Sequence, residues 1–356
     1  MNRFFKTALT VTTAIILAVS ASGCDGCNST SPLVFNSDFA GAGATEPSFG
    51  YTETLTYDVT NASDYNTILK KSDALTDELA EYSMNGTYTS SLKLLGSLPQ
   101  KSDGGEDIVT NIDVSDNTIY HLKTELNLNA TYKVGGEYAD GYTDSIDPDI
   151  PDGKTYNDRI VSEVFFLAAG QSFAPIWSSS KVKNSILSVS EKANVSVIEY
   201  SVITEYNSGS YKMRTVNGEE VTTDSYEYEF KRVIDTNQLL FAVRGLAINS
   251  NATKTFPVVS SSYGSAQSLV VENTAENTKT ANINGKTLEI PVKNLNFKRS
   301  TQYNTGIPHY ILLQKESVPD LSNKALVIEY AAPLTTYGTF TTMGALVYSL
   351  RTVSYN

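Results

Sequence analysis

The chain of 356 residues contains only two cysteines, two histidines and one tryptophan. Two cysteines are too few for a disulfide scaffold or for a cysteine-rich zinc or iron–sulfur centre. Basic residues are also scarce, because 27 Lys and Arg stand against 39 Asp and Glu and give a net charge of −12. A nucleic-acid backbone requires a basic protein face, so this balance argues against nucleic acid as a partner.

Long hydrophobic runs are limited to the N-terminus, where 17 uncharged residues extend from Thr7 to Gly23. A short basic segment precedes this run and small residues end it, which predicts a secretory signal peptide over residues 1–23. The run is at the lower limit of the roughly 17–25 residues that span a bilayer. A permanent transmembrane helix is therefore the weaker interpretation.

The segment Ala21-Ser22-Gly23-Cys24 resembles the bacterial lipobox, in which a cysteine is lipidated on sulfur and becomes the mature N-terminus. The resemblance implies lipid attachment at Cys24, with acyl chains such as palmitate, on the extracytoplasmic face of the cell membrane. More than one acyl chain suffices for stable anchoring. An ordinary cleaved leader with an incidental cysteine is the alternative. Cys27 lies in a Gly/Ser/Asn-rich segment, and we expect no function for it.

Residues 24–50 are small, polar and rich in Gly, Ser and Ala, which predicts a flexible tether. A chain of this composition from residue 25 to 50 has an end-to-end distance of about 25–30 Å. Loss of the leader removes two basic residues and no acid, so the mature net charge becomes −14. Anionic lipid surfaces repel such an acidic body. We expect the body to stand off the membrane.

Residues 51–356 alternate polar and apolar side chains with a period of two, which predicts an antiparallel β domain. In the first strand, Tyr51–Thr60, the apolar residues Leu55, Tyr57 and Val59 share one face. Two β subdomains with a break near residue 190 are the alternative organisation. Further strands are expected at 86–95, 118–132, 195–206, 211–216, 224–233, 286–297, 309–314, 324–330 and 344–353.

Three Asn-Gly pairs, Asn85-Gly86, Asn217-Gly218 and Asn284-Gly285, predict tight hairpins. Helical periodicity is confined to Thr236–Ile248, which Asp235 or Thr236 would cap, and more weakly to Asp73–Tyr82. The predicted fold class is mainly β: a large curved antiparallel sheet, half-barrel or sandwich-like, with one or two short helices.

Several short segments resemble a set of exported bacterial β-rich proteins of unknown function: residues 53–59, 226–230 leading into 237–242, 283–286 and 346–350. Residues 61–190 lie outside this resemblance. It implies an exported protein with a curved antiparallel sheet, and it supplies no catalytic residues.

Catalytic motifs are sparse. The sequence has no Gly-x-Ser-x-Gly elbow and no phosphate-binding loop. His121 and His309 occur in strand-like segments, where a histidine is more often hydrogen-bonded or on the surface than a catalytic base. Asp147, Asp149 and Asp152 form the one candidate metal loop, since Asp-x-Asp begins calcium loops. The alternative for this loop is a solvated turn built by Asp, Pro and Gly. No other cofactor is expected.

Aromatic residues are candidates for ligand contacts, either stacking on sugars or lining a cavity. We favour the interpretation that they face the core, because strand aromatics are normally buried. They are Phe165, Phe166, Phe173, Trp177, Tyr226, Tyr228 and Phe230.

The sequence predicts a lipid-anchored extracytoplasmic protein with a non-enzymatic binding or cell-envelope role. Its partners would be the membrane, through the anchor, and an unknown ligand or envelope protein, with the ligand on the concave side of the sheet. One alternative is an extracellular glycan hydrolase that uses paired carboxylates. Another is an adhesin-like module for protein interaction.

Overall fold

The computed structural model of the chain describes most of the sequence from Thr52 onward. The described residues are 52–62, 80–115, 118–134, 154–167, 173–189, 193–228, 233–245, 248, 253–259, 267–298, 309–316, 318–321, 325–334 and 344–356.

Within these ranges, fifteen strands form one sheet in the order β8-β7-β6-β5-β4-β3-β2-β1-β15-β14-β13-β12-β11-β10-β9. All neighbouring pairs are antiparallel except β9 and β10. The strands are β1 Thr52–Asn61, β2 Ala80–Leu95, β3 Ile119–Val134, β4 Thr155–Leu167, β5 Pro175–Val189, β6 Ala193–Asn207, β7 Ser210–Asn217, β8 Glu220–Glu227, β9 Ile234–Asp235, β10 Thr253–Val259, β11 Gln267–Ile283, β12 Lys286–Lys298, β13 Tyr310–Gln314, β14 Val327–Leu334 and β15 Gly344–Tyr355. The predicted large antiparallel sheet is confirmed.

The strand order is that of a ring opened at one seam. Each strand pairs with the next strand in the sequence except at β8 and β9, and the first strand, β1, also pairs with the last, β15. The two ends of the order are β8 and β9, which follow one another in the chain. The sheet is therefore not closed, and its seam falls in the middle of the sequence.

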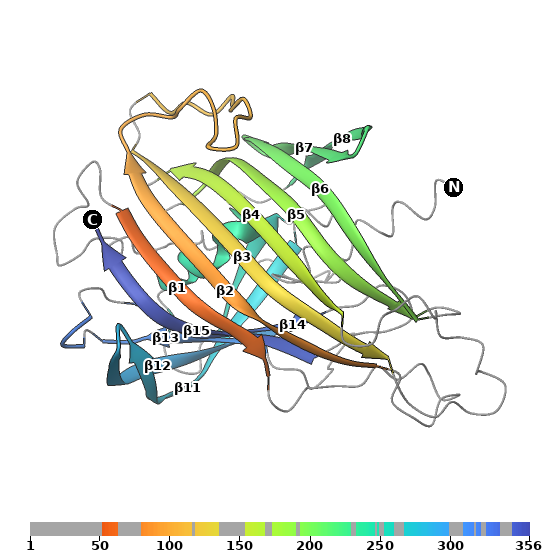
Figure 1. Cartoon of the computed structure of the whole chain (residues 1–356). Helices are drawn as coiled ribbons and strands as arrows, with labels where there is room; N and C mark the ends of the chain where they lie inside the picture. The colour runs from red at the N-terminus through yellow and green to blue at the C-terminus, as the bar shows by residue number, and fades with distance from the viewer. Residues whose placement is uncertain are drawn as a thin grey trace.

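The alternation of side chains sets which face of each strand is buried. In β1, Leu55, Tyr57 and Val59 are buried as predicted, and the residues between them point outward. Figure 1 shows β1–β6 curving across the front of the molecule, with β11–β14 beneath them. The main hydrophobic core draws residues from both sets of strands, so it lies between them.

A short helical segment lies behind β3–β5 in Figure 1, on the concave side of the sheet. It consists of the 3-10 turn η6 (Thr236–Gln238), the α-helical turn α2 (Leu239–Ala242) and the 3-10 turn η7 (Val243–Gly245). Asp235 caps it as predicted, and Gln238 completes a capping box. The described helical residues reach Gly245, and Ile248, the predicted end, is not helical. None of the helices in the described ranges is long and apolar enough to cross a bilayer.

Two local predictions are wrong. Asn85-Gly86 lies inside β2, where Gly86 pairs with Val59 on one side and Leu128 on the other, because two neighbouring strands extend the ladder through it. The predicted helix Asp73–Tyr82 fails at its end, since residues 80–82 begin β2 and pair with β3. Residues 73–79 lie outside the described ranges.

The other two Asn-Gly pairs lie at hairpins, one in the predicted position and one shifted by a residue. Asn284 and Gly285 both have positive φ and connect β11 to β12 as a two-residue hairpin. The β7–β8 hairpin turns at Gly218-Glu219, one residue later than the Asn-Gly pair predicts. Strands β4, β5, β10 and β11 are present although the sequence pattern did not predict them. Near residue 190, β5 pairs directly with β6.

Candidate functional site

The residues predicted for lipid attachment and calcium binding are not among those described. Cys24 and the loop residues Asp147, Asp149 and Asp152 all lie outside the described ranges. Both assignments stay predictions. The sites below are built from the described residues on the two faces of the sheet.

The concave face holds the helical segment through a buried carboxylate at its start. Asp235 accepts hydrogen bonds from the Ser178 hydroxyl at 2.6 Å and from the Tyr206 hydroxyl at 2.5 Å. It also accepts from the main-chain N–H of Asn237 at 2.7 Å. Burial raises the pKa of the Asp235 carboxyl, although these donors oppose the shift. The start of the segment is thereby fixed to β5 and β6.

A buried ion pair holds the other end of the segment. Arg244 in η7 donates from its two terminal nitrogens to both carboxylate oxygens of Glu53 in β1, at 2.5 and 2.9 Å. Only 3% and 2% of these side chains are exposed. Burial opposes the charge on Arg244, but the Glu53 carboxylate outweighs it and raises the arginine pKa. The segment is therefore fixed at both ends to strands far apart in the sheet.

Aromatic rings fill the space between these two contacts. The ring of Phe241 lies 5.1 Å from that of Phe173, 5.2 Å from Phe166 and 5.6 Å from Tyr120. All four rings are buried. Edge and tilted contacts of this kind favour tight packing. The core interpretation of Phe166 and Phe173 is confirmed.

The outer face of the sheet has a second, smaller core. Phe165 and Trp177 are fully buried there, with ring centroids 6.0 Å apart. This cluster is covered by part of the connection between β2 and β3, residues 96–115, here called the outer loop. The loop packs Leu98, Ile108 and Val114 onto the cluster. Trp177 is thus a core residue and does not offer a sugar-stacking surface.

Two of the remaining candidate aromatics lie at the end of the β7–β8 hairpin. Tyr226 and Tyr228 are half-buried against Tyr211, at 5.1 and 6.2 Å between centroids. Phe230 lies outside the described ranges. The two described tyrosines therefore pack against the sheet.

His121 lies under the outer loop and is hydrogen-bonded. Its Nε2 is 3.3 Å from Oε1 of Glu163 on β4, and its ring stacks on Phe165 at 4.4 Å. Oε1 of Glu163 also accepts the main-chain N–H of Asp103, from the outer loop, at 3.1 Å. Burial opposes ionisation of Glu163, but the contact with His121 outweighs it and lowers the carboxyl pKa. Asp103, His121 and Glu163 are the one group of possible metal ligands found among the described residues.

The second histidine has a different environment. His309 lies just before β13, half-buried, with its ring 4.6 Å from that of Phe297. It lies near the concave core, whereas His121 lies on the outer face.

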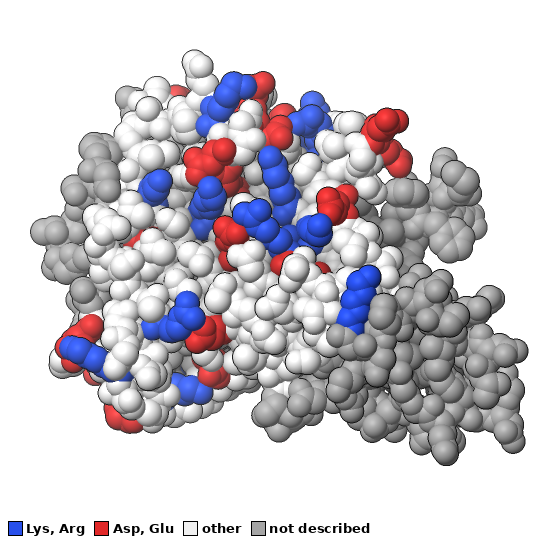
Figure 2. Space-filling model, viewed as in Figure 1, with Lys and Arg blue, Asp and Glu red and all other residues white. Residues whose placement is uncertain are grey.

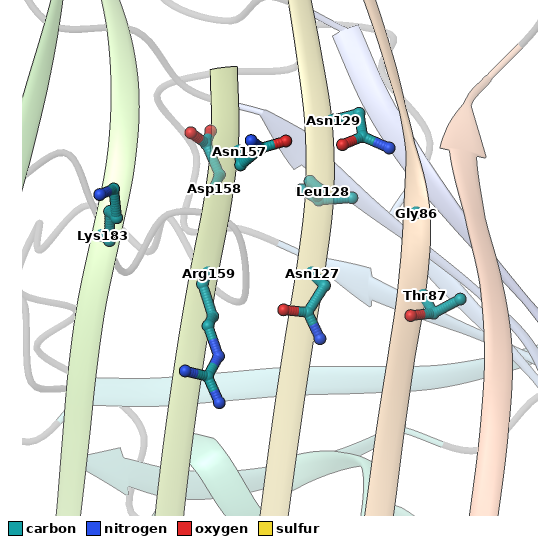
Figure 3. A pocket seen from close by; sticks show the side chains of 9 residues that line it. All are labelled: Gly86, Thr87, Asn127, Leu128, Asn129, Asn157, Asp158, Arg159 and Lys183. Atoms are coloured by element: carbon teal, nitrogen blue, oxygen red, sulfur yellow. The ribbon is translucent and has the colours of Figure 1, made fainter. Parts of the chain in front are cut away.

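A polar depression with a volume of about 530 Å³ lies across β2–β5 (Figure 3). Its exposed lining comprises the amides of Asn127, Asn129 and Asn157 and the cationic side chains of Arg159 and Lys183. Gly86, Thr87, Leu128 and Asp158 complete it. Amides that donate and accept, next to two cations, suit a hydroxyl-bearing or anionic ligand.

Gly86, one of the residues that line this depression, lies where β2 and β3 approach each other closely. A Cβ atom at position 86 would lie 1.9 Å from the main-chain oxygen of Asn127, so only glycine fits between β2 and β3 here. The Asn-Gly pair that resembled a turn therefore marks a close approach of two strands.

Asp158 is the buried carboxyl of the depression. Its oxygens accept from the main-chain N–H and the hydroxyl of Ser185, at 2.8 and 2.9 Å. Burial raises its pKa to about 6, and the Ser185 bonds limit the rise. A carboxyl in this range changes charge near neutral pH.

Figure 2 shows that Lys and Arg alternate with Asp and Glu over this outer face. Arg159 pairs with Glu125 at 2.9 Å, and Lys183 pairs with Glu199 at 2.8 Å. These pairs are largely exposed, so water competes for them. The two cations of the depression remain accessible to a ligand.

The sequence pattern did not predict the cluster at His121 or the depression. His121 and Glu163 are 42 positions apart and meet only through the β3–β4 register, which pairs His121 with Phe165. One sequence pattern in β3 could have indicated a polar site: His121, Lys123, Glu125 and Asn127 occupy alternate positions. That spacing places all four on one polar face.

No protein-family model matches the chain, and no curated protein matches its sequence. Among solved structures, the chain is similar to a crystal structure from Brucella abortus, described as a beta-barrel-like protein of a domain of unknown function, DUF1849. The identity is 9% and the TM-score 0.45, with 86% of this chain and 98% of that chain covered. The fold described above rests on the strand pairing of this chain.

Proposed function

We propose that the protein is a lipid-anchored extracytoplasmic binding protein without enzymatic activity, which holds a polar ligand of the cell envelope on its outer face. The leader and the lipobox-like segment ending at Cys24 support the anchor. The observation that carries the binding role is the depression across β2–β5, with three exposed amides and two exposed cations.

The sequence predicts a ligand on the concave side of the sheet. There the described residues form the main core and the helical segment, which is held by Asp235 and by the Glu53–Arg244 pair. The outer depression is open to solvent and polar, so we place the ligand there. Its chemistry favours an acidic saccharide, because amides match hydroxyl groups and the cations match a carboxylate or phosphate.

The same lining favours binding over glycoside hydrolysis. Hydrolysis needs two carboxyl groups flanking the bond. Among the residues that line the depression, Asp158 is the one carboxyl, and both of its oxygens accept hydrogen bonds from Ser185.

A titration of the purified protein with a short oligogalacturonate, and with a neutral oligosaccharide of equal length, tests the ligand class. We expect binding of the acidic sugar, and about tenfold weaker binding by Asn127→Ala/Asn157→Ala, from two lost hydrogen bonds. Asn282→Ala, exposed on β11, is the matched control. Equal weakening by the control, or no preference for the acidic sugar, would refute the proposal.

Membrane fractionation tests the anchor independently. Cys24→Ala should move the protein from the membrane fraction to the soluble fraction, because the acyl chains supply the membrane affinity. Cys27→Ala is the matched control and should stay in the membrane fraction. Retention of the Cys24 variant would contradict lipid attachment at this residue.

A further inference from the structure

Three possible ligands for a metal ion converge between the outer loop and the sheet. His121 comes from β3, Glu163 from β4 and Asp103 from the tight turn of the outer loop. One potential ligand atom from each lies within 4.8 Å of the others. The side chains of His121 and Glu163 are only 6% and 5% exposed, whereas Asp103 is 50% exposed at the rim.

The separation of the two buried ligands fits a tetrahedral ion. Bonds of about 2.0–2.1 Å at the tetrahedral angle place two ligand atoms about 3.3 Å apart. His121 Nε2 and Glu163 Oε1 are 3.3 Å apart. Asp103 has to move inward by about 1.5 Å to reach the same spacing. The Asp103 side chain is half-exposed, in a turn followed by Gly104 and Gly105, and its main-chain N–H is already bonded to Oε1 of Glu163.

The donor set indicates the kind of ion. One imidazole and two carboxylates suit zinc and related divalent transition metals, whereas calcium prefers six or more oxygen ligands. The imidazole is already oriented, since its ring is parallel to Phe165 within 4° and Nε2 faces Glu163. A ligand side chain that is already fixed in its orientation increases the affinity for the ion, because it loses little further conformational freedom when the ion binds.

Lys123 competes with a metal ion. Its ammonium lies 3.0 Å from Oδ2 of Asp103 and supplies a positive charge to that carboxylate in the metal-free protein. The Lys123 side chain is 39% exposed, so it can turn into solvent when a divalent ion takes its place.

We propose that Asp103, His121 and Glu163 form a binding site for a zinc-type divalent ion, which fastens the outer loop to β3 and β4. Water would complete the tetrahedron. The ion would thus stabilise the cover of the outer hydrophobic cluster. This site is separate from the depression and does not depend on the proposed function.

Isothermal titration of the purified, metal-stripped protein with zinc chloride tests the proposal. We expect one equivalent of zinc to bind through this site, an increase of several degrees in melting temperature that a chelator reverses, and slower amide exchange in residues 103–108. Calcium chloride at the same concentration should not slow exchange there. No zinc binding, or binding without protection of the loop, would overturn the proposal.

Variants assign the binding to these residues. His121→Gln and the exposed Asp103→Asn should each weaken zinc binding at least tenfold. His309→Gln removes the other histidine of the chain and should bind zinc as the parent does. Lys123→Met should bind zinc several-fold more tightly, because the competing ammonium is gone. Unchanged affinity in Asp103→Asn, or weaker binding by His309→Gln alone, would place the zinc elsewhere.

Discussion

Strand β1 carries two arginine–carboxylate pairs on opposite faces. On the concave face, Glu53 pairs with Arg244, and both side chains are almost completely buried. On the outer face, Asp58 pairs with Arg351 at 2.8 Å, and about half of each side chain is exposed. The buried pair has two hydrogen bonds and the exposed pair has one, and the two pairs also differ strongly in burial.

This difference separates the roles of the two faces. A buried charge that loses its partner stays in a medium of low polarity, whereas an exposed one is rehydrated at once. Polar groups on the concave face therefore fix the structure. On the outer face the exposed polar groups exchange easily with water, whereas His121 and Glu163 under the outer loop are buried.

Arg244→Met should have the largest effect, because it leaves Glu53 buried without its counter-charge. We expect the free energy of unfolding to fall by about 3–5 kcal/mol, measured by urea denaturation. The double variant Glu53→Leu/Arg244→Met removes both charges and should regain much of this loss. A single variant as stable as the parent would show that the helical segment is not held by this pair.

Asp158→Asn should have an intermediate effect that depends on pH. The folded-state pKa of about 6 lies above the ordinary value of 3.8, so the stability from protonated Asp158 is complete below pH 3.8 and is lost as the pH rises through 6. The loss amounts to at most about 3 kcal/mol. The variant should therefore be more stable than the parent at pH 8 and similar at pH 4.

Urea midpoints at the two pH values measure this difference. Asp224→Asn, exposed on β8, is the control and should follow the parent at both. An Asp158 variant that is less stable than the parent at pH 8 would show that the charged carboxylate is favoured in the fold.

Arg351→Gln should have the smallest effect. Exposed pairs contribute about 0–1 kcal/mol, and salt screens them further. We expect a shift in unfolding free energy within that range at low salt and no measurable shift in high salt. A loss comparable to that of Arg244→Met would remove the distinction between the two faces.

Features set by short-range pattern could be predicted from the sequence. The buried face of β1, the cap at Asp235 and the Asn284-Gly285 hairpin each depend on residues within a few positions of one another. The mainly β fold class could be predicted for the same reason, because many segments of alternating polarity joined by tight turns favour antiparallel strand pairing.

Features that depend on register could not be predicted. Glu53 and Arg244 are 191 positions apart, and nothing local to either one identifies its partner. The Asn85-Gly86 prediction failed for a related reason, since pairing of β2 on both sides outweighs a local turn preference. The cluster at His121 likewise needed the register of β3 against β4.

The seam between β8 and β9 bears on how separate molecules meet. A strand at the end of a sheet presents main-chain groups that can pair with another copy. Here β9 has only two residues, and β8 carries Glu220, Asp224 and Glu227. The β9 edge offers few main-chain groups for pairing because the strand is short, and the β8 edge repels a second β8 because both carry negative charge. Two copies brought side by side would therefore repel one another at the edge where edge-to-edge aggregation would otherwise begin.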